Sequence, residues 1–210
     1  MEKILITGTG RCGTTFLIKL FTFLNFDTGF TRDNYKRYIF PNCNSGMERK
    51  YTSKHYVLKS PDFITDMEQI LNDDSLKVKT VIIPIRDLRI SALSRVRNKD
   101  KEGGLWNATD EESQIEYYRT ILTNYEEVRT KYNVNTIFIE FDEMIKDKRY
   151  LFDMLKNILD EKNIDFNQFS RVYDEVSVTS KPQPPPPPPP PQPLPAKKKI
   201  IKFNKKLTWF

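Results

Sequence analysis

Residues 4–17 constrain the fold of this chain more than any other stretch. They begin with a short apolar run rich in β-branched residues, which predicts a buried strand. Three glycines then predict a tight turn, and residues 14–24 carry apolar side chains at helical spacing. A strand, a glycine-rich loop and a helix form a cradle for a phosphate group, because glycine lets the backbone approach an anion and the helix N-terminus adds partial positive charge. The predicted cradle consists of Gly8, Thr9, Gly10, Arg11, Cys12, Gly13, Thr14 and Thr15.

The loop differs at one position from the Walker A loop of ATP-dependent enzymes, in which Lys and Ser or Thr follow the second glycine. Gly8 and Gly13 have the Walker spacing, but Thr14 stands where the Lys would be, and the cation is Arg11. A kinase needs that Lys beside a magnesium ion. The missing Lys argues against this chemistry, and a small-molecule or nucleotide kinase is kept as the alternative hypothesis, with Asp142 as its candidate metal-holding acid.

Strands alternate with amphipathic helices along the rest of the chain. We expect further strands at residues 56–58, 78–85 and 136–141, and helices at residues 87–97, 148–159 and 166–173. Ser60-Pro61-Asp62 is typical of a helix start, and a capping box at residues 109–112 predicts the start of a long helix. Pro84 predicts either a bulge or the end of its strand.

This alternation predicts an α/β fold of three layers, with a mainly parallel sheet flanked by helices. Ligands of such sheets bind outside the carboxyl ends of the strands. Three segments with a cation directly follow predicted strands: the loop at residues 8–15, Lys59 and Arg86. We therefore expect these cations to lie on one edge of the sheet.

The loop Arg11-Cys12-Gly13-Thr14-Thr15 resembles that of the P-loop sulfotransferase family, in which Lys or Arg stands two residues before Gly-Thr-Thr. The resemblance covers roughly residues 3–160. It implies a P-loop fold, with 3′-phosphoadenosine-5′-phosphosulfate as the sulfuryl donor and no metal. The 5′-phosphosulfate of the donor would lie in the loop.

Two further segments resemble this family in the same order along the chain. Lys59-Ser60-Pro61-Asp62-Phe63 is similar to the segment after the second strand in the sugar-modifying branch, where the Lys reaches the transferred sulfuryl group. Arg86, followed eight residues later by Ser94, resembles the 3′-phosphate site. Arg can grip a phosphate with two parallel N–H bonds, and Arg89 is a spare cation that could share the role.

The chain departs from the small-molecule branch of the family in two places. The catalytic His of that branch would stand at position 61, which is Pro61, and its C-terminal Arg-Lys-Gly segment is not visible. The resemblance is therefore to the sugar-modifying or bacterial-like branch, in which an acidic residue after the first helix acts as base. Asp33 is the candidate and Asp27 the runner-up, whereas His55 is expected to be structural.

The implied function is transfer of a sulfuryl group to a hydroxyl or amine of a small-molecule or carbohydrate acceptor. The catalytic residues would be Arg11, Lys59 and Asp33. Two polar segments, residues 25–53 and a flap at residues 99–109, are expected to define the acceptor, although neither carries a readable signature.

The composition changes sharply near residue 180. We expect a folded domain at residues 1–179, a polyproline linker at 180–196 and a basic-aromatic tail at 197–210, with the tail region disordered. The polyproline segment could bind an SH3-like or profilin-like partner, and a non-catalytic scaffold acting through it is a further alternative. The basic tail could bind an anionic surface.

Charge and cysteine content narrow the class of protein. Six lysines lie in residues 197–210 without an acid, and the rest of the chain carries equal numbers of basic and acidic residues. We therefore expect no nucleic-acid binding by the folded domain. The two cysteines form no disulfide framework, no apolar run is long enough to span a membrane, and the chain enters a strand at once. These features predict a cytoplasmic protein.

Overall fold

The computed structural model describes residues 2–40, 43–98 and 102–180. Its centre is a parallel sheet in the order β4 (Val57–Lys59), β1 (Glu2–Ile6), β5 (Lys77–Ile85) and β6 (Thr136–Glu140). The prediction of an α/β fold with a parallel sheet is confirmed. The polyproline linker, the basic tail and the partners predicted for them lie outside the described residues.

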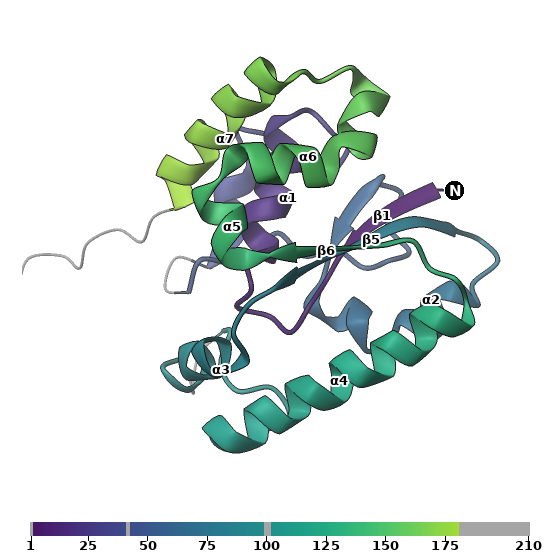
Figure 1. The fold of residues 1–210 in the computed structure, drawn as a ribbon, viewed down its shortest axis with the longest axis vertical. Coiled ribbons are helices and arrows are strands. Elements are labelled where there is room, and N and C mark those ends of the chain that lie inside the picture. The colour runs from purple at the N-terminus through teal and green to yellow at the C-terminus, as the bar shows by residue number, and fades with distance from the viewer. Residues whose placement is uncertain (1, 41–42, 99–101, 181–210) are drawn as a thin grey trace, which may run out of the picture.

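Helices cover both faces of the sheet, which gives three layers (Figure 1). On one face lie α1 (Thr14–Phe23), α5 (Phe141–Lys146), α6 (Lys148–Leu159) and α7 (Phe166–Ser180). On the other lie α2 (Met67–Leu71), α3 (Leu88–Val96) and α4 (Glu111–Lys131). Alternating residues of β1 supply both cores: Ile4 and Ile6 pack with α1, α6 and α7, and Leu5 packs with α2 and α4.

The register of the sheet aligns the strand ends that carry the predicted site. Ile6, the last residue of β1, pairs with Lys59 on β4 and with Ile82 on β5. The glycine-rich loop and Lys59 therefore leave the sheet side by side. β5 runs on to Ile85, so Arg86 leaves slightly beyond them.

Pro84 marks the end of its strand and not a bulge. It lies in β5 and pairs in register with Ile139 of β6, while the irregularity in the sheet is at Lys3 and Ile4. The carbonyl of Ile82 faces β1, where it accepts from the N–H of Thr7 at 3.0 Å. Pro84 has the same orientation two residues later, where β1 has already ended, so its missing N–H costs no ladder bond.

Several predicted helix boundaries need correction. The capping box of α4 is formed by Asp110 and Ser113, one residue later than predicted. Ser60 caps as predicted, but the helix is a single 3₁₀ turn, η2 (Pro61–Ile64), followed by the separate short α2. Phe141 opens α5, which the sequence did not predict, and α7 runs well past the predicted end at residue 173.

The long connection at residues 25–53 has structure of its own. It contains a 3₁₀ turn, η1 (Tyr35–Tyr38), and a small antiparallel pair of strands, β2 (Ile39–Phe40) and β3 (Ser45–Gly46). A third 3₁₀ turn, η3 (Asp160–Lys162), follows α6. Within the described ranges, no helix combines the length and the apolar character needed to cross a membrane.

Candidate functional site

The loop between β1 and α1 has the backbone geometry of an anion cradle. Gly8, Gly10 and Gly13 have φ values of 149°, 75° and 98°, and Arg11 between them has a φ of 57°. Within the described part of the chain, no backbone N–H of residues 8–15 donates to a backbone carbonyl. Backbone groups of Gly10 and Cys12 bond to the Cys12 thiol, and N–H groups at the start of a helix are the usual donors to a bound anion.

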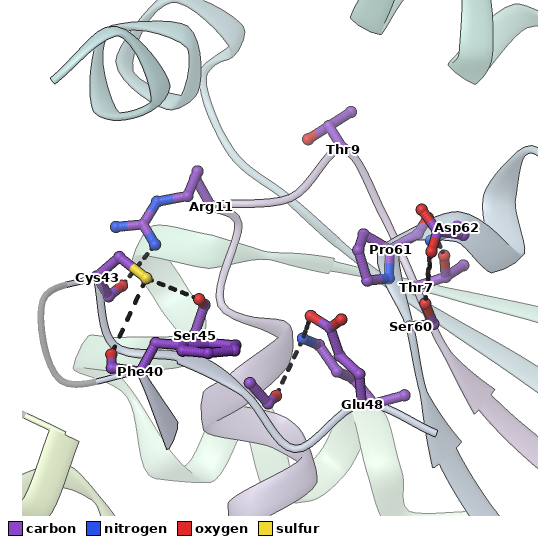
Figure 2. Close-up of polar contacts among 12 residues, drawn as sticks. Thr7, Thr9, Arg11, Phe40, Cys43, Ser45, Glu48, Ser60, Pro61 and Asp62 are labelled. Carbon is purple, nitrogen blue, oxygen red and sulfur yellow. Dashed lines mark hydrogen bonds and ion pairs between the residues drawn. The ribbon is translucent and has the colours of Figure 1, made fainter. Parts of the chain in front are cut away.

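Arg11 is the side chain around which this loop is organised. A left-handed backbone is uncommon for a residue other than glycine, and here the side chain is fixed at both ends of its guanidinium. Its Nε donates to Oγ of Ser94 at 2.9 Å, and its Nη1 donates to the carbonyl oxygen of Cys43. Figure 2 shows the guanidinium directed toward the Cys43 segment.

The two residues predicted to hold a 3′-phosphate both contact Arg11. Ser94 accepts from its guanidinium, and Nη1 of Arg86 donates to the Arg11 carbonyl oxygen at 2.9 Å. The guanidinium of Arg86 also lies over the ring of Phe141, 4.4 Å from its centroid. Arg89, the predicted spare cation, is exposed and pairs with Glu111 at 2.9 Å, so it does not join this group.

Lys59 is buried beside the loop and has a carboxylate partner that the sequence did not suggest. Its side chain is 3% exposed, and Nζ donates to Oε1 of Glu48 at 2.8 Å and to the carbonyl oxygen of Gly46 at 3.2 Å (Figure 2). The N–H of Arg49 donates to the Lys59 carbonyl oxygen at 3.0 Å, which brings Glu48 alongside Lys59.

A cavity of about 740 Å³ connects these groups. Its walls include the loop, Lys59, Arg86, and parts of both segments predicted to define the acceptor, namely Phe40, Cys43, Asn44, Ser45, Glu48, Glu102 and Gly103. A second cavity of about 570 Å³ shares Glu48 and Asp62 with the first. Cavities of this size hold small-molecule ligands.

Sequence reasoning missed Arg95, which is only 7% exposed and lines the same cavity. It donates to the carbonyl oxygens of Thr9 and Gly104 and to the hydroxyl of Tyr118. A signal was present, because Arg95 continues the buried face of α3 formed by Ser91 and Ala92. A charged residue on a buried helix face is rarely there without a partner or a ligand.

The three arginines share one cavity wall, and within the described residues none of them forms an ion pair with a carboxylate. Burial lowers the pKa of the Arg11 guanidinium, and the nearby charges of Arg95 and Arg86 act in the same direction. A cluster of like charges in a partly buried site favours a bound anion.

Three predicted or considered residues lie elsewhere. Asp33 is exposed and does not line the cavity; its neighbour Arg32 donates to the carbonyl oxygen of Phe23, at the far end of α1. That end is about 15 Å from the loop at a rise of about 1.5 Å per residue. Asp27 pairs with His55 at 2.6 Å beside the amino end of β4, also away from the site.

Cys12 contributes backbone and packing to the loop. Its thiol is fully buried, and burial raises the thiol pKa, which disfavours a reactive thiolate. Asp142, the candidate acid of the kinase hypothesis, is exposed and does not line the cavity. Among the residues described, no three His, Cys, Asp or Glu side chains form a group suited to a metal ion.

Comparisons with known proteins do not assign a family. Neither protein-family models, nor curated proteins, nor solved structures gave a match to this chain. What the site does is therefore inferred from its own residues.

Proposed function

We propose that this chain is a P-loop sulfotransferase, which transfers a sulfuryl group from 3′-phosphoadenosine-5′-phosphosulfate to a hydroxyl or amine of an acceptor. One observation carries the proposal: three arginines without a carboxylate partner among the described residues line one cavity beside the glycine-rich loop. A donor with anionic groups at both its 3′ and 5′ positions would balance that charge.

The residues present fit such a donor at two places. The loop and Arg11 would hold the 5′-phosphosulfate, because N–H groups and a guanidinium are strong donors to phosphate-like oxygens. Arg86 and Ser94 lie against Arg11 and would hold the 3′-phosphate. Each charged hydrogen bond of this kind contributes about 1.5–3 kcal/mol.

Lys59 would act in the chemical step. Transfer joins the acceptor atom to sulfur and breaks the bond from sulfur to the bridging phosphate oxygen, on which the electron pair remains. An ammonium held by Glu48 and Gly46 beside the loop would stabilise this charge. These two contacts already fix the position of the Lys59 side chain.

Glu48 replaces Asp33 as the candidate base. Its carboxylate lines both cavities, contacts Lys59 and is 45% exposed, so it can accept a proton from an acceptor and pass it to water. The second cavity, which shares Glu48 and Asp62 with the first, would admit the acceptor. A carbohydrate is one candidate, since carboxylates accept hydrogen bonds from sugar hydroxyls.

Ligand preference tests this function against the kinase alternative. We expect adenosine 3′,5′-bisphosphate to raise the melting temperature without magnesium and to do so more than ATP or adenosine 5′-monophosphate. At a hundred times the dissociation constant the stabilisation is about 2.7 kcal/mol, or about 5–11 °C for a domain of this size. An equal shift with ATP, or a shift that needs magnesium, would favour the kinase.

A further inference from the structure

Arg95 connects three parts of the molecule that are far apart in the sequence. Its Nη2 donates to the Thr9 carbonyl oxygen in the glycine-rich loop at 3.3 Å, and its Nη1 to the Gly104 carbonyl oxygen at 2.6 Å. Its Nε donates to the hydroxyl of Tyr118 on α4 at 2.7 Å. The guanidinium also lies over the ring of Trp106, 5.2 Å from its centroid.

The contact with the loop is close. Gly10 has a φ of 75°, and a Cβ added there would collide with Nη2 of Arg95. The peptide unit from Thr9 to Gly10 is planar, so the bond from Arg95 to the Thr9 carbonyl oxygen also fixes the direction of the next N–H. If an anion moves this peptide unit, the guanidinium has to move with it.

The other side of Arg95 holds a wall of the cavity. Glu102 and Gly103 line that wall, and a Cβ added at Gly103 would lie 3.4 Å from Nη1 of Arg11. The same segment is tied down at Trp106, whose N–H donates to Oε1 of Gln114 at 2.7 Å and whose carbonyl accepts from Nε2 at 3.2 Å. Arg95 therefore links this wall to the neighbouring glycine-rich loop by hydrogen bonds to both.

We propose that Arg95 is a positioning residue that couples anion binding in the glycine-rich loop to the placement of residues 102–106, the wall beside Arg11. The identity of the nucleotide rests on the proposed function, but the coupling does not, because any anion that moves the loop would act on it. If the chain transfers a sulfuryl group, binding of the donor would position residues 102–106 beside the acceptor through Arg95.

Trp106 reports this coupling directly. The chain has two tryptophans, so Trp209→Phe leaves Trp106 as the single tryptophan, whose emission is excited selectively over that of the tyrosines. In this parent chain, adenosine 3′,5′-bisphosphate should change the Trp106 emission over the concentration range in which calorimetry detects binding. In Arg95→Gln the nucleotide should still bind, at most about tenfold more weakly, with the emission change lost. Arg97→Gln, at the exposed end of the same helix, should behave as the parent.

A second variant decides the question if Arg95→Gln does not fold. Tyr118→Phe removes only the hydroxyl that accepts from Nε of Arg95, so it should reduce the emission change while the dissociation constant stays within about threefold. A full emission change in Tyr118→Phe would then overturn the proposal. So would a full change in a folded Arg95→Gln, or nucleotide binding to the parent without any change.

Failure of the proposed function is seen separately, as absence of nucleotide binding in the calorimeter. Sodium sulfate then serves as the probe in the same chains. An emission change in the parent that Arg95→Gln lacks would support the coupling, and no change in the parent would overturn it.

Discussion

The ion pair between Lys59 and Glu48 should respond unequally to the loss of either partner. The Lys59 side chain is 3% exposed and that of Glu48 is 45% exposed. Glu48→Ala would leave a buried ammonium with the Gly46 carbonyl oxygen as its remaining described acceptor. Lys59→Met would leave a carboxylate that water already reaches, and an apolar chain of similar length in the buried space. Glu48→Ala should therefore be the more destabilising change.

The magnitude follows from the burial of the two groups. Removing one partner of a fully buried pair costs about 3–5 kcal/mol. Because water reaches Glu48, we expect about 1.5–3 kcal/mol, the range for a hydrogen bond to a charged group. Each kcal/mol shifts the melting temperature of such a domain by about 2–4 °C, so Glu48→Ala should lower it by about 3–12 °C. Lys59→Met should stay within about 1 kcal/mol of the parent.

Urea denaturation of the parent, both single variants and the double variant measures this asymmetry. In the Lys59→Met background, Glu48→Ala should cost less than about 0.5 kcal/mol, because no buried ammonium remains to be left alone. Glu68→Ala is the matched control, since its pair with Lys131 is exposed on both sides and should contribute little to stability. Equal costs of Glu48→Ala in the two backgrounds, or a larger cost for Lys59→Met, would refute the reasoning.

Three further predictions concern the arginine cluster and the core. Arg86→Ala should weaken adenosine 3′,5′-bisphosphate by about 10–150-fold while leaving adenosine 5′-monophosphate unchanged, and Arg89→Ala should change neither in calorimetry. Gly10→Ala should lose about 1–3 kcal/mol in urea denaturation from its left-handed backbone alone; an unchanged stability would contradict that geometry. Burial lowers the pKa of Lys19 to about 8, so between that value and about 10.4 the unfolded chain binds the extra proton and stability rises with pH. The stability of Lys19→Met relative to the parent should therefore be highest at pH 7 and decline by pH 10, and a constant difference would contradict the lowered pKa.

Local sequence signals predicted the sheet edge well. The strand ends before Gly8, Lys59 and Arg86 were readable from short apolar runs, and parallel pairing necessarily brings such ends to one edge. The bounds of α6 were also predicted correctly, because its apolar face is regular and Asp147 caps its first turn.

The partners of the site could not be predicted, because they depend on contacts between distant segments. Residues 25–53 fold back so that the N–H of Arg49 meets the Lys59 carbonyl oxygen, which brings Glu48 and not Asp33 to the lysine. The position of an acidic residue after the first helix, which suggested Asp33, carries no information about how residues 25–53 fold back. Arg95 was missed for a related reason, since its acceptors lie in the loop, in the flap and on α4.

The cations of the site differ in what holds them, and this difference separates binding from chemistry. Arg11, Arg86 and Arg95 donate to hydroxyl and carbonyl oxygens, which fix each guanidinium in place without cancelling its charge. Their positive charge therefore remains available to an anion, and the three guanidinium groups are already held in position before an anion binds. Lys59 instead donates to a carboxylate, so its charge is balanced before any ligand arrives. When a proton reaches Glu48, that balance is lost and the ammonium becomes free to stabilise negative charge nearby. In the proposed sulfuryl transfer to a hydroxyl, proton uptake by Glu48 and charge stabilisation by Lys59 would thus occur together.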